Sequence, residues 1–349
     1  MIRMTTDARS THVAHGQQTG ATTRAVVFDS LGGPEVLKVK EVPLPAPGPG
    51  EIQVKVEAIG LNRAEALFRS GGYYYQAALP GSRIGYEAAG VVEAVGEGVT
   101  AHAPGDLVLA SAGFEFGVYG VHAEHVVGPA EYWVARPPGV DATAGAAAWL
   151  TYSTAYGALH ETAHIAPGDH VLITGASSGV GTAAIQTVRR AGAIPLVTTR
   201  GADKRERLLA LGAAEVIVTG TEDLVKEVRR ITGGKGADVA FDAIGGEGFA
   251  TVGDALRPGG TSVLYGWLDA GPVHLSFNWP LTVHAYNNGV PMADPALRDR
   301  AAAYLASGIA SGTLAPVIAE TFDGLDRIGD AHRLMETNRH TGKIVVRLA

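Results

Sequence analysis

A glycine-rich segment over residues 174–181 carries the strongest chemical signal in this sequence. It follows an apolar run at 170–174, typical of a strand buried on both faces, and precedes a helical pattern at 183–192. The N-terminus of such a helix offers unpaired N–H groups and partial positive charge, which together bind a pyrophosphate. Ala176 and Ser178 stand at the first two glycine positions of the G-x-G-x-x-G pattern, and both are small. We therefore predict that a dinucleotide contacts Ser178, Gly179, Val180 and Gly181.

The end of the next strand, at 196–199, indicates which dinucleotide binds. An enzyme that uses NAD usually places Asp or Glu there to hold the ribose 2′-hydroxyl. Here hydroxyls and cations occupy that position, and Asp203 is offset toward the following helix. Arg200 and Lys204 could hold a 2′-phosphate through charge-assisted hydrogen bonds. The sequence therefore favours NADPH over NADH.

The composition is that of a globular chain. The 349 residues suffice for roughly two domains, and 46% of them are apolar against 18% charged. The formal charge of −7 argues against a nucleic-acid partner, and the absence of a long apolar run argues against a membrane span. Cysteine is absent, which removes disulfides and sulfur-bound zinc, so no metal site is expected.

The pattern of elements divides the chain into two parts. Short strands with Gly and Pro turns, between residues 24 and 110, predict a small antiparallel barrel. From residue 170, five strands alternate with helices, which predicts a doubly wound parallel sheet of the α/β class. Helices at 295–311 and 324–337 precede a last strand at 342–346, which can return to the first domain. Residues 1–23 lack the apolar core of a secretory signal, so we expect a flexible tail and a cytoplasmic protein.

These features together resemble the quinone oxidoreductase (zeta-crystallin-like) branch of the medium-chain dehydrogenase/reductase superfamily. The segments that carry the resemblance are GGPEVL (32–37), LN (61–62), RSGGY (69–73), GYEAAGVV (85–92), GD (105–106), the loop at 172–181 and GKIV (342–345). It implies a GroES-like β-barrel domain from residues 24–148 and 290–349. A Rossmann domain for NADPH would then occupy residues 149–289, and the protein would be a homodimer with an interface near 260–290.

The resemblance also implies where the cofactor and the substrate bind. Asn62 and the residues after it would approach the nicotinamide, and Tyr73 would contact the acceptor, since flat rings stack well on aromatic side chains. Leu67 departs from the tyrosine that some quinone reductases carry near the substrate. The remaining family contacts with the cofactor fall on Thr154, Thr219, Ala243, Tyr265, Gly266, Trp267 and Lys343.

One departure from the superfamily concerns zinc. Its zinc alcohol dehydrogenases have Gly-His-Glu where this chain has Gly85-Tyr86-Glu87, and their cysteine ligand aligns near Asn62. Without zinc as a Lewis acid, we expect hydride addition to an electron-poor quinone or α,β-unsaturated carbonyl. Two alternatives stay open: an enone or enoyl-thioester reductase of secondary metabolism, and a crystallin-like protein that binds NADPH without turnover.

Other motifs carry less weight. The H-E-x-x-H pattern at 160–164 suggests a zinc protease, but it lies just before the strand of the dinucleotide loop, so we interpret it as the end of a helix. His122 and His125 are expected to be ordinary surface or strand histidines. No tyrosine precedes a lysine by four residues, as a short-chain dehydrogenase requires. Asp242 ends the fourth strand and could contact a ligand or cap the next segment.

Overall fold

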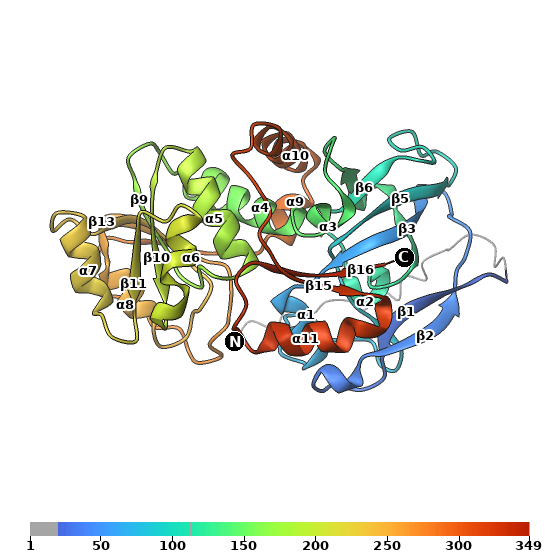
Figure 1. Cartoon of the computed structure of the whole chain (residues 1–349), viewed down its shortest axis with the longest axis horizontal. Helices are drawn as coiled ribbons and strands as arrows, with labels where there is room; N and C mark the ends of the chain where they lie inside the picture. Colours follow the sequence, from blue (N-terminus) through green and yellow to red (C-terminus); the bar gives the residue numbers. More distant parts are fainter. Residues whose placement is uncertain (1–19, 112, 349) are drawn as a thin grey trace.

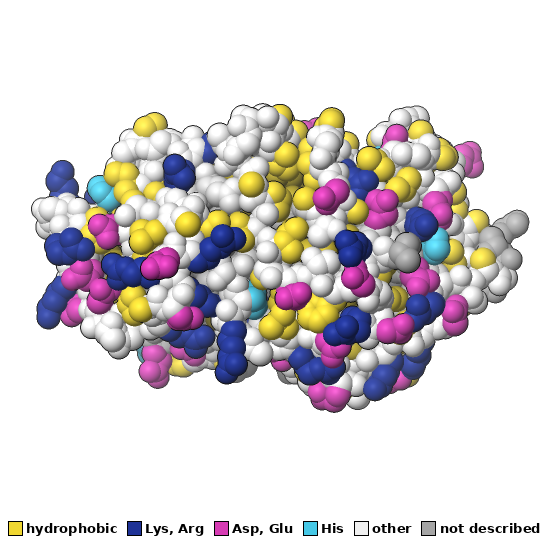
Figure 2. Space-filling model, in the orientation of Figure 1, with side chains coloured by type: hydrophobic (Ala, Val, Ile, Leu, Met, Phe, Trp, Pro, Cys, Tyr) yellow, Lys and Arg dark blue, Asp and Glu magenta, His cyan; other side chains and the backbone are white. Residues whose placement is uncertain are grey.

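The computed structural model describes residues 20–111 and 113–348, which form two halves lying side by side (Figure 1). The predicted tail over 1–23 falls mostly on residues outside this range, and strand β1 already begins at Thr22. Within the described residues, no helix is long and apolar enough to cross a membrane. Figure 2 shows Lys and Arg side chains interspersed with Asp and Glu on the face viewed, rather than gathered into a patch of one sign.

One half is built on a six-stranded sheet whose neighbouring strands are all parallel. The strand order is β11–β10–β9–β12–β13–β14, which is the order 3-2-1-4-5-6 of the Rossmann fold when β9 is counted first. The predicted doubly wound sheet is thus confirmed. The strands are β9 (His170–Ile173), β10 (Ile194–Thr199), β11 (Glu215–Val218), β12 (Ala237–Asp242), β13 (Leu256–Leu264) and β14 (Thr282–Ala285).

Helices connect these strands and cover the sheet (Figure 1). They are α5 (Gly179–Arg190), α6 (Arg205–Ala210), α7 (Leu224–Ile231) and α8 (Phe249–Asp254). Helix α5 begins four residues earlier than the apolar pattern predicts, because the Ser178 hydroxyl accepts a hydrogen bond from the Gly181 amide and caps the first turn. The strand order reverses between β9 and β12, and ligands of such sheets bind beyond the strand ends at that point.

The other half contains the predicted barrel, which confirms the GroES-like class. A seven-stranded sheet runs in the order β15–β16–β3–β5–β6–β8, with β7 also paired to β3, and a second sheet has the order β2–β1–β4. The strands are β1 (Thr22–Phe28), β2 (Lys38–Pro43), β3 (Glu51–Gly60), β4 (Ser82–Arg83), β5 (Ala88–Val95), β6 (Leu107–Ala110), β7 (His125–Pro129), β8 (Trp133–Ala135), β15 (Ile318–Asp323) and β16 (Lys343–Arg347).

The returning last strand is the feature that joins the two ends of the chain. β16 lies between β15 and β3 and pairs antiparallel with β3, with Val345 opposite Gly60. The apolar GKIV segment is therefore buried in the barrel, as predicted for the last strand. The sequence patterns did not reveal β15, which pairs with β16 in parallel, because only part of each of its faces is buried.

Several helices lie outside the Rossmann sheet, and some differ from prediction. The helix expected at 145–164 is instead α3 (Ala142–Gly145), α4 (Trp149–Tyr156) and a π-helical turn (Gly157–Thr162). The strand expected at 36–39 begins only at Lys38, because Pro34 opens a 3₁₀ turn before it. The other helices are α1 (Arg63–Arg69), α2 (Phe116–Tyr119), α9 (Gly289–Met292), α10 (Pro295–Ala310) and α11 (Ile328–Glu336).

Candidate active site

A cavity of about 710 Å³ is lined by residues of both halves. The barrel half contributes α1, the loop before β5 and the segment that begins α2. The Rossmann half contributes the glycine-rich loop and the residues after β12 and β13. The predicted site residues that line it are Asn62, Tyr73, Thr154, Ser178, Gly179, Val180, Ala243, Tyr265, Gly266, Trp267 and Lys343. Residues chosen along almost the whole sequence are therefore brought together around one space.

The glycine-rich loop has the backbone geometry that a phosphate site needs. Gly175 has a φ of +57°, which L side chains rarely adopt, and it turns the chain from β9 into α5. A side chain at Gly181 would place its Cβ 2.5 Å from the Gly175 carbonyl oxygen, so only glycine lets the helix pack this closely on the loop. The first turn of α5 therefore presents its N–H groups to the cavity at Gly179 and Val180.

Arg200, Lys204 and Thr219 do not line the cavity but lie at the carboxyl edge of the same sheet. Arg200 directly follows β10 and is exposed, and Thr219 directly follows β11. The Lys204 ammonium donates to the Ser177 hydroxyl at 3.0 Å and to the Asn338 and His340 carbonyls. Burial and the positive charge of Arg200 lower the pKa of Lys204, against the opposing effect of Asp203. Two cations thus stand beside the loop.

A buried polar network closes the barrel end of the cavity. The Lys343 ammonium lies 2.5 Å from a Glu87 carboxylate oxygen and also donates to the Asn62 side-chain carbonyl. The Asn62 amide group donates to Glu87 at 3.1 Å and to the Gly60 carbonyl at 3.2 Å. The second Glu87 oxygen accepts from the Leu150 backbone amide at 3.0 Å. All three side chains are buried, so a charge pair and an amide hold each other in one arrangement.

Aromatic rings of the barrel half form another part of the cavity wall. Tyr86 stacks on Phe116, with ring centroids 4.9 Å apart and planes 16° from parallel. Tyr73 packs against the same Phe116 at 5.2 Å. Burial is the main cause that raises the pKa of Tyr73 and of Tyr86, so both phenols stay protonated at physiological pH. This wall offers flat apolar surface together with hydroxyl groups that can donate a hydrogen bond.

The Rossmann wall of the cavity is fixed by close packing. The Tyr265 ring stacks on Phe241 with centroids 3.9 Å apart. A Cβ at Gly266 would lie 2.5 Å from the Ala243 carbonyl oxygen, which requires glycine there. Thr154 is buried on α4, and its hydroxyl donates to the Leu150 carbonyl at 2.6 Å.

Comparison with known proteins places this geometry in a family. Residues 48–138 match the family "Alcohol dehydrogenase GroES-like domain" and residues 179–290 match "Zinc-binding dehydrogenase". The chain is 32% identical to the quinone oxidoreductase of Lama guanicoe over 331 residues, which is 93% of this chain and 97% of that protein. The chain belongs to the quinone oxidoreductase branch of the medium-chain dehydrogenase/reductase superfamily.

Two further relatives show similarity over the same length of the chain. A 2-haloacrylate reductase of Burkholderia sp is 31% identical over 337 residues, covering 92% of this chain and 98% of that protein. The Escherichia coli quinone oxidoreductase, solved in complex with NADPH, superposes with a TM-score of 0.86 at 29% identity, covering 94% of this chain and all of that chain. The family resemblance predicted from the sequence is therefore confirmed.

In this member of the quinone oxidoreductase branch, the residues at the positions of the superfamily's zinc ligands contact other residues of the cavity region. The Asn62 amide group donates to Glu87, the Tyr86 ring is stacked on Phe116, and the Lys343 ammonium already pairs with Glu87. A zinc ion needs deprotonated sulfur, imidazole or carboxylate ligands, and here a lysine ammonium holds the one carboxylate.

Sequence reasoning missed part of the aromatic wall and the polar network of this quinone oxidoreductase relative. Phe116 and Tyr286 line the cavity from a short helix and from the segment after β14. No spacing links such residues, because separate loops bring them together. The Glu87–Lys343 pair joins residues 256 positions apart, and the two partners were noted only singly, as parts of separate motifs.

The structure shows the surroundings of three other residues that the sequence analysis singled out. Asp242 does not line the cavity: it is fully buried, accepts hydrogen bonds from Thr174 and from the Gly245 amide, and thus caps the segment after β12. Glu161 of the H-E-x-x-H pattern accepts two hydrogen bonds of 3.0 Å from Arg300, so it is not a free base. His125 begins β7 and is partly exposed, as expected.

The expectation for His122 was wrong. It lies outside the strands and is fully buried beside Glu65 and His332, because the side-chain-free Gly85 leaves room for its ring.

Proposed function

We propose that the protein is an NADPH-dependent, zinc-independent reductase that transfers hydride to a quinone or an α,β-unsaturated carbonyl. The observation that carries the proposal is the single cavity that is lined by a phosphate-binding loop and by an aromatic wall with protonated phenols. Family membership supports the same activity.

The proposed cofactor fits the residues present. Gly179, Val180 and the capped first turn of α5 would hold the pyrophosphate, and Arg200 with Lys204 would hold the 2′-phosphate. The backbone at Gly266 packs closely on Ala243, and this part of the wall would contact the nicotinamide half of the cofactor. NADPH supplies the hydride chemistry when it is bound. Solved relatives with NADPH, including that of Escherichia coli, support this assignment.

The chain's own residues would then orient the acceptor. Tyr73 and Tyr86 stack against its flat ring or conjugated chain, and their phenols donate a hydrogen bond to its carbonyl oxygen. The Asn62–Glu87–Lys343 network would fix the cavity floor, because the paired charges and the amide hold one another in place. In this proposal the proton that completes the reduction comes from solvent.

A panel of acceptors tests the function. We expect NADPH oxidation with simple benzoquinones and with enones, and a loss of rate in Tyr86→Phe greater than in the control Tyr119→Phe, which lies outside the cavity. Turnover confined to enoyl thioesters would favour the alternative that the CurK enoyl reductase structure suggests, at 26% identity and a TM-score of 0.83 over 94% of this chain and all of that one. Tight NADPH binding without turnover on any acceptor would contradict the proposal.

We also propose that two copies pair along β14. This strand is the last of the six-stranded sheet and pairs only with β13 among the described residues. Beside it, Phe277 is 87% exposed and Trp279 is 68% exposed, an apolar surface that a monomer would leave in water. Sedimentation should show a dimer that Phe277→Asp dissociates, whereas Leu31→Asp on the barrel should not. A monomeric wild type would contradict this proposal.

A further inference from the structure

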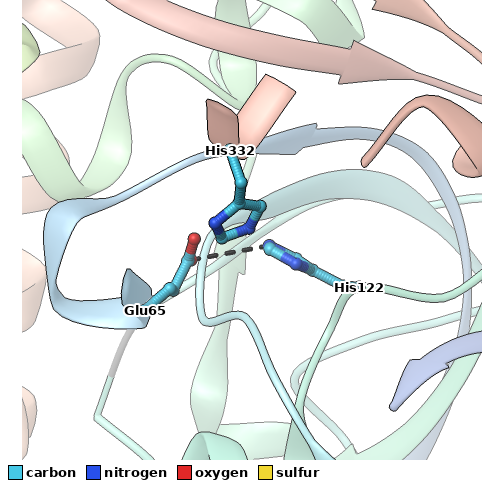
Figure 3. A group of neighbouring side chains, drawn as sticks. All are labelled: Glu65, His122 and His332. Carbon is cyan, nitrogen blue, oxygen red and sulfur yellow. Dashed lines mark ion pairs between the residues drawn. The ribbon is translucent and has the colours of Figure 1, made fainter. Parts of the chain in front are cut away.

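A second cluster of ionisable side chains lies in the barrel half, outside the cavity (Figure 3). It joins Glu65 of α1, His122 before β7 and His332 of α11, and all three are fully buried. Their ligand atoms lie within 4.8 Å of one another, and a Glu65 oxygen is 3.5 Å from His122 Nε2. Figure 3 shows the carboxylate and both rings pointing toward one another from three separate elements.

The fold makes room for this cluster. A Cβ at Gly85 would lie 2.0 Å from the His122 ring, and the φ of +96° at Gly85 also favours glycine. The Glu65 oxygen that lies 3.5 Å from His122 also accepts a long 3.5 Å hydrogen bond from the Asn62 side-chain amide. The other Glu65 oxygen accepts a 3.0 Å hydrogen bond from the Asn62 backbone amide. This bond orients the carboxylate in the way that outer-shell hydrogen bonds orient metal ligands.

The polar atoms of the cluster are poorly satisfied by the protein. Both ring nitrogens of His122 and both of His332 are buried without a hydrogen-bond partner among the described residues. Each such atom costs about 1–3 kcal/mol unless a ligand or a water satisfies it. Glu65 pairs with no lysine or arginine among those residues, because the neighbouring Arg69 pairs with Glu336.

The geometry of the cluster suits a cation. A Glu65 carboxylate oxygen is 3.5 Å from the Nε2 atom of His122, and the ring nitrogens of both histidines have no hydrogen-bond partner among the described residues. A buried carboxylate beside orphaned nitrogen atoms is the environment that a cation would neutralise.

We propose that Glu65, His122 and His332 bind a divalent transition-metal ion of the Zn²⁺ type. Two imidazole nitrogens and one carboxylate oxygen are a zinc ligand set, and bonds of about 2.0–2.2 Å place tetrahedral ligand atoms roughly 3.3–3.5 Å apart. The Glu65–His122 separation already has that value, and the His332 nitrogen lies within 4.8 Å of the other ligand atoms, so binding requires it to move closer. Three protein ligands leave the fourth tetrahedral position to a water molecule. Because the cluster is fully buried, a substrate cannot reach that position, so the ion is structural.

Such an ion would cross-link three segments, two of which carry residues of the cavity wall. α1 also holds Asn62 at its N-terminus, and α11 contributes Met335 to the cavity lining. None of the three ligands lines the cavity, although Glu65 accepts a hydrogen bond from Asn62 of the cavity wall. The proposed metal site is therefore distinct from the catalytic zinc position at Tyr86 and Asn62, and it does not depend on the proposed reductase activity.

Metal analysis of the full chain without a polyhistidine tag tests the site. After expression in zinc-supplemented medium, followed by purification and dialysis without chelator, we expect mass spectrometry to find one zinc ion per chain. Glu65→Gln and His332→Asn should each weaken zinc binding at least about 100-fold, since even the loss of an outer-shell partner costs 10–100-fold. The control His125→Asn removes a partly exposed histidine and should retain the full zinc content.

Two further measurements keep the test decisive if a variant fails to fold. Chelator should lower the Tm of the wild type and zinc should restore it, with a smaller effect in Glu65→Gln. Cobalt added to the chelator-treated wild type should give the visible absorption of a tetrahedral nitrogen and oxygen ligand set. Wild type without stoichiometric zinc, or with no more zinc than Glu65→Gln, overturns the proposal and leaves a buried water as the occupant.

Discussion

Arg200 offers the sharpest test of cofactor selection. It stands at the end of β10, where an NAD enzyme would carry a carboxylate, and its exposed guanidinium is free to hold a 2′-phosphate. Lys204 lies nearby but also donates to three oxygens of the protein, so its removal would disturb the loop as well as the phosphate site. Arg200→Ala therefore isolates the phosphate contact.

The size of the effect follows from the exposure of the side chain. A charge-assisted hydrogen bond contributes about 1.5–3 kcal/mol, and the water around Arg200 places this one at the lower end. A loss of about 1.5 kcal/mol corresponds to roughly a tenfold fall in kcat/KM, since 1.36 kcal/mol is one decade. NADH carries no 2′-phosphate, so its kcat/KM should change by less than about twofold.

Steady-state kinetics with one quinone acceptor and each cofactor in turn measure this difference. Arg207→Ala is the matched control, because Arg207 is an equally exposed arginine on α6. It should leave both cofactors unaffected. If Arg200→Ala lowers kcat/KM equally for NADPH and NADH, or leaves NADPH unchanged, the 2′-phosphate assignment is wrong.

Three other perturbations have defined outcomes. Glu87→Leu leaves the Lys343 ammonium buried and unpaired, so urea unfolding should show a loss of about 3–5 kcal/mol, whereas a neutral result would contradict a buried charge pair. Gly181→Ala should abolish measurable NADPH binding in a fluorescence titration, while Gly248→Ala, which has open space around its Cβ, should not. The pKa of His332 is lowered by burial to about 3 from an unfolded value of about 6.5. With chelator present and at a pH between those two values, His332 therefore binds a proton in the unfolded chain but not in the folded chain. His332 should contribute up to about 1.4 kcal/mol per pH unit to the fall in unfolding free energy. His332→Asn should reduce the slope by that amount, and His340, whose pKa burial lowers to about 4, should account for part of the remaining slope.

The Rossmann half was predictable because its signals are local. Apolar strands, turn glycines and the loop at 174–181 follow one another within short windows, and each specifies its own element. Ala243 and Gly266 line the cavity because parallel strands present their carboxyl ends at one edge, but they were assigned from the family resemblance and not from a local pattern. The resemblance also supplied Asn62 and Lys343, which local patterns could not.

The unpredicted features depend on contacts between distant segments. The ring of His122 is buried because a glycine 37 positions earlier leaves space, and the sequence pattern around His122 does not show this. Glu65 and His332 are separated by 267 positions and meet only once α1 and α11 have packed on the barrel. Composition could exclude a sulfur-bound metal, but it could not exclude one held by nitrogen and oxygen.

The return of β16 explains why the site needs both ends of the chain. β16 begins at Lys343, and its pairing with β3 places the ammonium against Glu87 and Asn62. The residue before it, Gly342, donates its amide to the Ser177 carbonyl of the glycine-rich loop at 2.9 Å. One short segment thus contacts both the phosphate loop and the polar floor of the cavity. This segment therefore fixes the position of one half relative to the other where cofactor and acceptor would meet. The cavity is complete only when the last strand has docked.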